Sequence, residues 1–267
     1  MPLPSPSFVM AHGVIGLADA VGMDPARDQR LIQALRPEFP NVINHQLPPA
    51  GLPVLAPHLV LASSSSQLAI SLGQADFEVR FYGDYLNDLD KGLEYVERKL
   101  QAVRAGFAAV DLVPSSVGLI ATLHFSCAEI DGASPAEHIQ TTLLRTNVGS
   151  DVLQDALARV GIRIRDTYYA TLTVANFESR TIQRPMIPGL PARVKPWEGQ
   201  VNDQGIELAI DINNNLESKV RREDAQVTDA GIGAVMHMTR ELATNAGPDF
   251  AETGELALDA IIASSRS

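Results

Sequence analysis

The chain has 267 residues, of which 32 are acidic and 21 are basic, so its formal net charge is −11. Nucleic acids and anionic lipid repel such a chain unless basic residues cluster locally. Cys127 is the single cysteine, which excludes an intramolecular disulfide and is typical of a reducing compartment. The first residues lack a signal-peptide pattern, and no apolar run approaches the ~20 residues of a membrane span. We therefore expect a cytoplasmic protein with no membrane partner.

The first third of the chain changes from a helical to an alternating pattern. Asp24-Pro25 predicts the start of a helix that ends before Pro37, because aspartate caps free amides and proline suits the first helical position. A proline-rich extended connection then runs to Pro57. From residue 58 to 81, apolar and polar residues alternate, which predicts a β-hairpin with one face in water. The polar run 63–66 interrupts it as a bulge or a crossing between strands.

The strongest helical signal covers residues 85–107. Its apolar residues follow steps of three and four, and they include Leu89, Leu93, Val96, Leu100 and Val103. After Pro114, alternate apolar residues predict a strand that continues to Cys127. Ser134, Pro135 and Glu137 form a capping box, which predicts a helix to about Arg145.

The next segment mixes helical and strand patterns. We expect a helix opened by Ser150 and ended by Gly161, because Leu153, Leu157 and Val160 follow helical spacing. Strands follow from Ile162 to about Arg184, with a turn near Asn176. The proline- and glycine-rich stretch 185–199 predicts a long loop.

The last elements complete the fold class. Alternating Ile and Leu predict a strand at 206–212, Thr228 caps a helix, and the tail after Gly247 is irregular or weakly helical. Segregated strands and helices predict an α+β fold with antiparallel sheets and packed helices. The β-β-α order occurs twice, which suggests two similar lobes. The predicted divisions are an N-terminal helix and proline-rich segment at 1–57 and two lobes at 58–150 and 151–267.

Several segments together resemble a sporadically distributed family of uncharacterised bacterial proteins of similar length. The segments that carry the resemblance are 32–40, 46–49, the hairpin end Phe81-Tyr82 with the helix after it, and the strand 208–212 before the helix with His237. The resemblance implies a laterally transferred accessory gene and brings no established activity or active site. At 13–22, Gly- and Ala-rich sequence stands where the family has an opening strand, so this chain departs from the family there and the first strand stays an open question.

Few residues carry a chemical signature. The chain has no zinc-ligand, P-loop or nucleophile-elbow motif, so we expect no metal and no cofactor. His124 and Cys127 lie three apart on a strand and point to opposite faces, so they do not share a metal. Cys127 is in phase with Leu123 and Phe125, which predicts a buried, inert thiol.

One strand carries polar residues in a row. Glu207, Asp211 and Asn213 occupy its solvent face, where residues two apart are separated by roughly 7 Å. A metal-dependent hydrolase or nuclease is an alternative function, provided that Asp211 meets a second carboxylate or His124 in space.

Positive charge gathers in the second half of this acidic chain. The candidate partner-binding residues are Arg163, Arg165, Tyr169, Arg180 and Arg184. Arginine and tyrosine together are favoured at protein interfaces. A solvated strand face is the competing interpretation of the same residues.

Three functions remain open from the sequence. The first is a non-enzymatic protein-binding or regulatory protein of a bacterial accessory module, such as defence or toxin–antitoxin. The second is the hydrolase or nuclease near Asp211. The third is an RNA-binding module, which the net charge of −11 disfavours. A homodimer is compatible with each.

Overall fold

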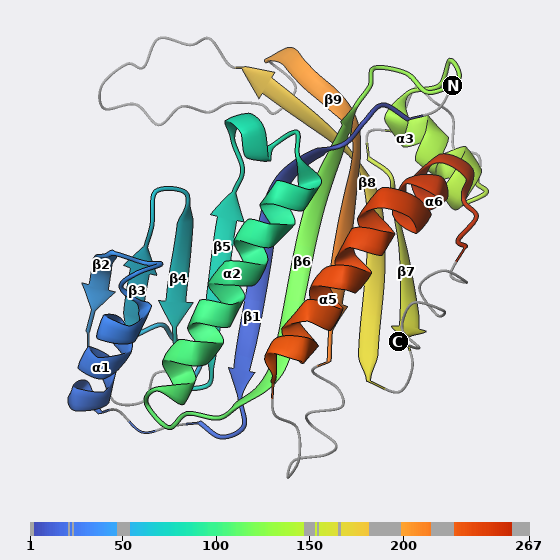
Figure 1. The fold of residues 1–267 in the computed structure, drawn as a ribbon. Coiled ribbons are helices and arrows are strands. Elements are labelled where there is room, and N and C mark those ends of the chain that lie inside the picture. Colours follow the sequence, from blue (N-terminus) through green and yellow to red (C-terminus); the bar gives the residue numbers. More distant parts are fainter. Residues whose placement is uncertain are drawn as a thin grey trace.

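One antiparallel sheet forms the centre of the molecule. The computed structural model describes residues 3–20, 22, 24–46, 54–146, 153, 155–164, 167–181, 199–214 and 227–257. Within these ranges the strand order is β2-β3-β4-β5-β1-β6-β9-β8-β7 (Figure 1). The strands are β1 (Ser7–Leu17), β2 (Asn41–His45), β3 (Leu59–Ala62), β4 (Ser66–Ile70), β5 (Gln74–Arg80), β6 (Pro114–Ser126), β7 (Leu157–Ile164), β8 (Tyr168–Thr181) and β9 (Gln200–Asn213).

Helices cover one face of this sheet. They are α1 (Pro25–Leu35), α2 (Leu89–Ala108), α3 (Pro135–His138), α5 (Asp229–Glu241) and α6 (Gly247–Thr253), with a 3₁₀ turn η1 (Gly83–Tyr85) and π-helical turns η2 (Ile139–Leu143) and η5 (Leu242–Ala246). The two longest, α2 and α5, lie side by side across the sheet (Figure 1). Arg104 of α2 binds Asp229 at 2.7 Å, and Arg240 of α5 binds Asp90 at 2.6 Å. These partly exposed ion pairs each add about 0–1 kcal/mol, so apolar packing holds the two helices in place.

The apolar core fills the space between the sheet and the helices. Strand side chains alternate between faces, so every second residue points toward the helices. The buried strand residues of this face are Phe8, Ala11 and Ile15 of β1, Val117, Leu119, Ala121, Leu123 and Phe125 of β6, Ile206, Leu208, Ile210 and Ile212 of β9, and Ala170, Leu172 and Val174 of β8. Leu93, Val96, Leu100 and Val103 of α2 pack against them.

Two glycines let α2 approach β1 closely. A Cβ atom at Gly13 of β1 would lie 2.8 Å from a methyl carbon of Leu100. A Cβ atom at Gly92 of α2 would lie 2.5 Å from the ring of Phe8. Larger residues at either position would push the helix away from the sheet, so these glycines set the helix–sheet distance.

The sequence signals for helix starts are confirmed. The Asp24 side chain accepts hydrogen bonds from the amides of Ala26 and Arg27. Ser134 forms the expected capping box with Glu137, and Thr228 caps α5 by accepting from the amide of Gly231. The long helix is also confirmed, but α2 starts at Leu89 after an Asp88 cap, with η1 before it. Residues 63–66 form the turn between β3 and β4, where the Ser63 amide donates to the Ser66 carbonyl.

Two local predictions are wrong, and the first strand, which the sequence left open, is present. Residues 7–17, which include the Gly- and Ala-rich start of 13–22, form the central strand β1. Residues 157–161 belong to strand β7, because pairing with β8 overrides the helical spacing of Leu157 and Val160. Ser150 lies outside the described residues. Asn176 makes no turn, since β8 runs through it and its side chain accepts from the amide of Ala156 at 2.7 Å.

The α+β class with an antiparallel sheet is confirmed, but one sheet joins strands from all three predicted divisions. The separation into two similar lobes stays a prediction. None of the described helices is long and apolar enough to cross a membrane.

We expect truncation in the centre of α2 to destabilise the protein strongly. Leu93 and Leu100 are essentially inaccessible to solvent, so Leu93→Ala or Leu100→Ala should cost about 2–5 kcal/mol in the free energy of unfolding. Chemical denaturation measures this loss. Glu94→Ala, at an exposed position of the same helix, is the control and should change the free energy by no more than ~0.5 kcal/mol. Equal losses from the leucine and glutamate variants would contradict the packing of α2.

Candidate functional site

The sheet face opposite α2 and α5 carries a mixed surface, here called the open face. No described helix packs on it (Figure 1). Cross-strand pairing places its central residues side by side, and they are mostly half-buried. These are Met10, His12 and Val14 of β1, Ile120, Thr122 and His124 of β6, Glu207, Ala209, Asp211 and Asn213 of β9, and Tyr169, Thr171, Thr173 and Phe177 of β8.

A histidine surrounded by carboxylates lies near the middle of the open face. The Nε2 atom of His12 is 3.5 Å from an Asp76 carboxylate oxygen. The hydrogen bond to Asp76 raises the pKa of His12, partial burial opposes the rise, and the charges of Asp76, Glu78 and Asp211 add to it. Burial acts to raise the pKa of Asp76, but hydrogen bonds from His12 and Gln74 outweigh it and lower that pKa. Each group of the pair therefore favours the charged form of the other.

Glu207 and Asp211 of β9 lie apart from each other, and the hydrolase alternative stays a prediction. His124 contacts Glu207 at 3.0 Å and stacks on the ring of Phe177. Asp211 lies four residues further along β9, about 13 Å away by strand rise, and it accepts a hydrogen bond from the Asn213 amide at 3.1 Å. No group of three His, Cys, Asp or Glu in the described ranges has the geometry to hold a metal ion.

The arginine and tyrosine residues of the predicted partner-binding face separate into two places. Arg163 of β7 pairs across the strands with Tyr169 of β8 on the open face. Arg180 lies at the other end of β8, about 36 Å from Tyr169 by strand rise. There its guanidinium binds the Glu178 carboxylate and the Gly199 carbonyl. Arg165 and Arg184 lie outside the described residues.

A polar hollow of about 560 Å³ lies beside Arg180. Its lining comes from the start of α3, from residues before β7 and from the far ends of β8 and β9. Glu178, Arg180 and Gln204 give it charged and amide groups. The sequence did not predict this hollow, since it forms only where the four segments meet.

Cys127 is half-buried and not buried as the sequence predicts, because β6 ends one residue before it. Its thiol donates to the carbonyl of Phe125 at 3.3 Å. Burial raises the pKa of the thiol, with a further contribution from the charge of Asp203. A raised pKa means a low thiolate fraction, which is a physical reason for the thiol to react slowly. The low reactivity of Cys127 therefore stays a prediction.

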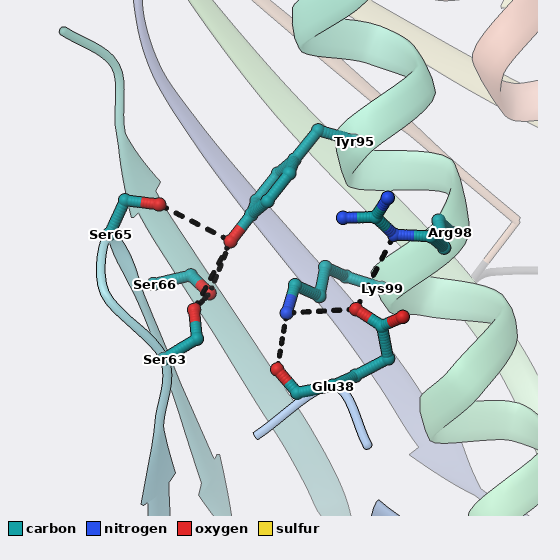
Figure 2. Close-up of polar contacts among 7 residues, drawn as sticks. All are labelled: Glu38, Ser63, Ser65, Ser66, Tyr95, Arg98 and Lys99. Carbon is teal, nitrogen blue, oxygen red and sulfur yellow. Dashed lines mark hydrogen bonds and ion pairs between the residues drawn. The ribbon is translucent and has the colours of Figure 1, made fainter. Parts of the chain in front are cut away.

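A group of four hydroxyl oxygens lies where the β3–β4 turn meets α2 (Figure 2). We call Ser63, Ser65, Ser66 and Tyr95 the hydroxyl cluster. The Tyr95 hydroxyl lies 3.2 Å from Ser63, 3.3 Å from Ser65 and 3.0 Å from Ser66, and the Ser63 and Ser66 hydroxyls are 2.7 Å apart. Partial burial acts to raise the pKa of Tyr95, but the three serine hydroxyls and the Lys99 charge outweigh it and lower that pKa.

A buried lysine supports the hydroxyl cluster. Lys99 lies one helical turn after Tyr95 on α2 and is 3% exposed. Its ammonium group binds the Glu38 carboxylate at 3.0 Å and also the Glu38 carbonyl. It lies 4.4 Å from the ring centroid of Phe39 and 5.2 Å from that of Tyr95. Arg98, which is more exposed, contacts the same Glu38 carboxylate at 3.4 Å (Figure 2).

Sequence reasoning identified the run 63–66 only as a polar interruption and did not connect it with Tyr95. The available signal was a tyrosine and a lysine four residues apart on the predicted helix 85–107. Their proximity to the serines depends on packing between segments about thirty residues apart, which a local pattern does not contain.

A second buried polar group lies under α1. The carboxylate of Asp28 is 3.3 Å from Nε2 of His45 and 3.5 Å from Nε2 of His58. Asp28 and His58 are both buried, and Nδ1 of His58 has no hydrogen-bond partner among the described residues. This contact ties α1 to the segments flanking β2 and β3.

No protein-family model matches the chain, and no curated protein matches it. Membership of the sporadically distributed bacterial family stays a prediction. Functional conclusions therefore rest on the geometry of the open face and of the hydroxyl cluster.

The His12–Asp76 pair should make stability depend on pH. A raised folded pKa means that His12 stabilises the fold fully below its ordinary pKa of 6.5, and that this contribution is lost as the pH rises through the folded value. We expect the loss of unfolding free energy in His12→Gln to be larger at about pH 5 than at about pH 9. Urea denaturation at both pH values measures it. In an Asp76→Asn background the pH dependence should largely disappear, and its persistence would contradict the pairing.

Cys127 should react slowly in the folded protein. Because burial raises the pKa of its thiol, the thiolate fraction is small at about pH 8. We expect a disulfide reagent such as 5,5′-dithiobis(2-nitrobenzoate) to modify the native protein at least ~10-fold more slowly than the denatured chain. Stopped-flow absorbance gives both rates. Equal modification rates in the native and denatured states would show that the thiol is not shielded and that its pKa is not raised.

Proposed function

We propose that the protein is a binding or regulatory protein of a bacterial accessory module, such as defence or toxin–antitoxin, and that it binds a protein partner through the open face. The observation that carries this proposal is that face itself. It spans the sheet on the side opposite α2 and α5 without a described helix on it, and it mixes apolar, aromatic and charged side chains. A cytoplasmic location, supported by the lone cysteine, is part of the proposal.

The residue composition of the open face is closer to that of a protein interface than to that of a surface exposed only to water. Val14 and Ile120 lie on neighbouring central strands, and Tyr169 and Phe177 lie on β8. An exposed sheet face needs none of these residues to fold, whereas protein interfaces combine aromatic residues with a polar rim. Antiparallel sheets with one uncovered face are common, so it is the apolar and aromatic content that supports binding.

Charge on the open face is divided between its middle and one edge. Asp76, Glu78 and Asp211 make the middle acidic, while Arg159 and Arg163 lie exposed on the edge strand β7. A partner that contacts both regions needs complementary charges in the same arrangement. Such a pattern favours specific protein binding over nucleic acid, because phosphates would be repelled from the acidic middle.

The arginine edge should control binding of the partner. We expect Arg159→Glu with Arg163→Glu to reduce recovery of a partner at least ~10-fold, because like charges then replace complementary ones. The measurement is affinity purification of the full chain from its native host, with protein identified by mass spectrometry and nucleic acid by gel staining. Partners recovered with wild type are then titrated against both proteins.

The matched control reverses two exposed arginines, Arg30 in α1 and Arg36 at its C-terminal cap, as Arg30→Glu with Arg36→Glu, and should retain the partner. Thermal unfolding of both variants shows whether folding is intact. Equal binding by wild type and the β7 variant would remove the open face as the interface. Recovery of RNA in place of protein would favour the RNA-binding alternative.

A further inference from the structure

Three serine hydroxyls surround one phenolic oxygen in the hydroxyl cluster (Figure 2). In a neutral tyrosine, one of the serines has to accept the phenolic proton. In a phenolate, two of the serines can donate to the oxyanion, because the bond between Ser63 and Ser66 uses the proton of one of them. The hydroxyl cluster can therefore hold Tyr95 in either form, and the surrounding charges decide which form is favoured.

The charge of Lys99 favours the phenolate. Its ammonium group is buried 5.2 Å from the centroid of the Tyr95 ring, where water screens it weakly. Glu38 compensates the lysine, yet Arg98 adds a second cation 5.3 Å from the same ring. The pKa of Tyr95 lies below its ordinary value, in agreement with this geometry.

Exposure differs between the members of the hydroxyl cluster. Ser66 is buried, Ser63 and Tyr95 are half-buried, and Ser65 is exposed at the tip of the turn. A molecule arriving from solvent therefore meets the Ser65 hydroxyl first. Ser65 lies 3.3 Å from the Tyr95 oxygen, within reach for proton transfer.

We propose that Ser65 is a nucleophile activated by Tyr95 toward acyl or phosphoryl electrophiles. The Tyr95 phenolate removes the proton of the Ser65 hydroxyl while the serine oxygen bonds to the carbonyl carbon or the phosphorus. The bond to the leaving group breaks, and the leaving group takes the proton from Tyr95. The products are a serine ester and the protonated leaving group, so atoms and charge balance without a further reactant.

The positive charges near Tyr95 have a role in this step. Arg98 is 59% exposed and lies over the Tyr95 ring, so its charge reaches the solvent side of the hydroxyl cluster. An electrophile gains negative charge on oxygen as it is attacked, and nearby cations stabilise that charge. Lys99 remains bound to Glu38 and keeps the phenolate favoured.

A fluorophosphonate probe tests the proposal on the full chain. Attack by Ser65 breaks the phosphorus–fluorine bond and leaves a phosphonylated serine, which peptide mass spectrometry locates. We expect a single adduct at Ser65, and a labelling rate that rises with pH and levels off below the pKa of ~10 of a free phenol. Ser65→Ala should abolish the adduct. Tyr95→Phe should slow labelling at least ~10²-fold, the lower range for loss of a general base.

Ser64→Ala is the matched control, because Ser64 is exposed in the same turn as Ser65 and makes no hydrogen bond to Tyr95 in the described structure. It should label at the wild-type rate. Thermal unfolding shows whether Tyr95→Phe, which keeps the aromatic ring, is folded. Ultraviolet titration follows the phenolate directly, and the component that ionises below ~10 should vanish in Tyr95→Phe.

Two results would overturn the proposal. One is the absence of an adduct in the wild-type protein, even if the low-pKa tyrosine is seen by titration. The hydroxyl cluster would then only fasten the β3–β4 turn to α2. The other is labelling of Ser64, or labelling of Ser65 at the wild-type rate in folded Tyr95→Phe, since either would show that Tyr95 activates nothing.

Discussion

Burial of one sheet face beneath α2 and α5 is the constraint on which the rest of the structure depends. The central strands β1, β6 and β9 place every second residue in this layer, and a slip of one residue in any of them would exchange buried and open faces. Gly13 and Gly92 fix how closely α2 lies on β1. The same alternation assigns the remaining residues of each strand to the open face, so the core defines the candidate interface.

The buried lysine is the main exception to this division of apolar and polar groups. Lys99 lies on the helix side of the sheet, where an unpaired charge would be strongly destabilising. Glu38 neutralises it, and the rings of Phe39 and Tyr95 contact the ammonium group. A buried pair of this kind contributes little net stability, because desolvation offsets the attraction. Its effect is local: it joins the segment after α1 to α2 and places a fixed positive charge next to the hydroxyl cluster.

The sequence predicted the elements whose signals are local. It did not predict some of the segments whose structure depends on pairing with another strand. Three helix starts were predicted from residues whose side chains accept hydrogen bonds from amides within three residues, namely Asp24, Ser134 and Thr228. Predicting these helix starts needed no tertiary information. Strand β1 was left open because Gly13 and Gly16 lower the strand signal, although one of them is required for close packing of α2. The part of β7 from Leu157 to Gly161 was taken for a helix because its pairing with β8 is absent from a local window, whereas the strand from Ile162 was predicted.

The candidate sites show the same limit. The phase of Arg163 and Tyr169 was read correctly, since alternation along two strands determines a shared face. The prediction that Arg180 shares a site with them was wrong, because β8 has 14 residues and its two ends are far apart. For the hydroxyl cluster no local pattern was sufficient, since the β3–β4 turn reaches Tyr95 only through the packing of α2 on the sheet.

Strand β4 contributes residues both to the hydroxyl cluster and to the open face, but on opposite sides of the sheet. Its residues alternate, so Ser66 points to the helix side while Gln67, its neighbour in the chain, lies opposite Glu78 on the open face. A partner on the open face therefore covers Gln67 and Glu78 without entering the contact between the serines and Tyr95. Ser65 lies in the turn directly before Ser66, the first residue of β4, and is exposed. Binding and serine chemistry can therefore occur in one molecule, with the electrophile carried by the partner or arriving from solvent.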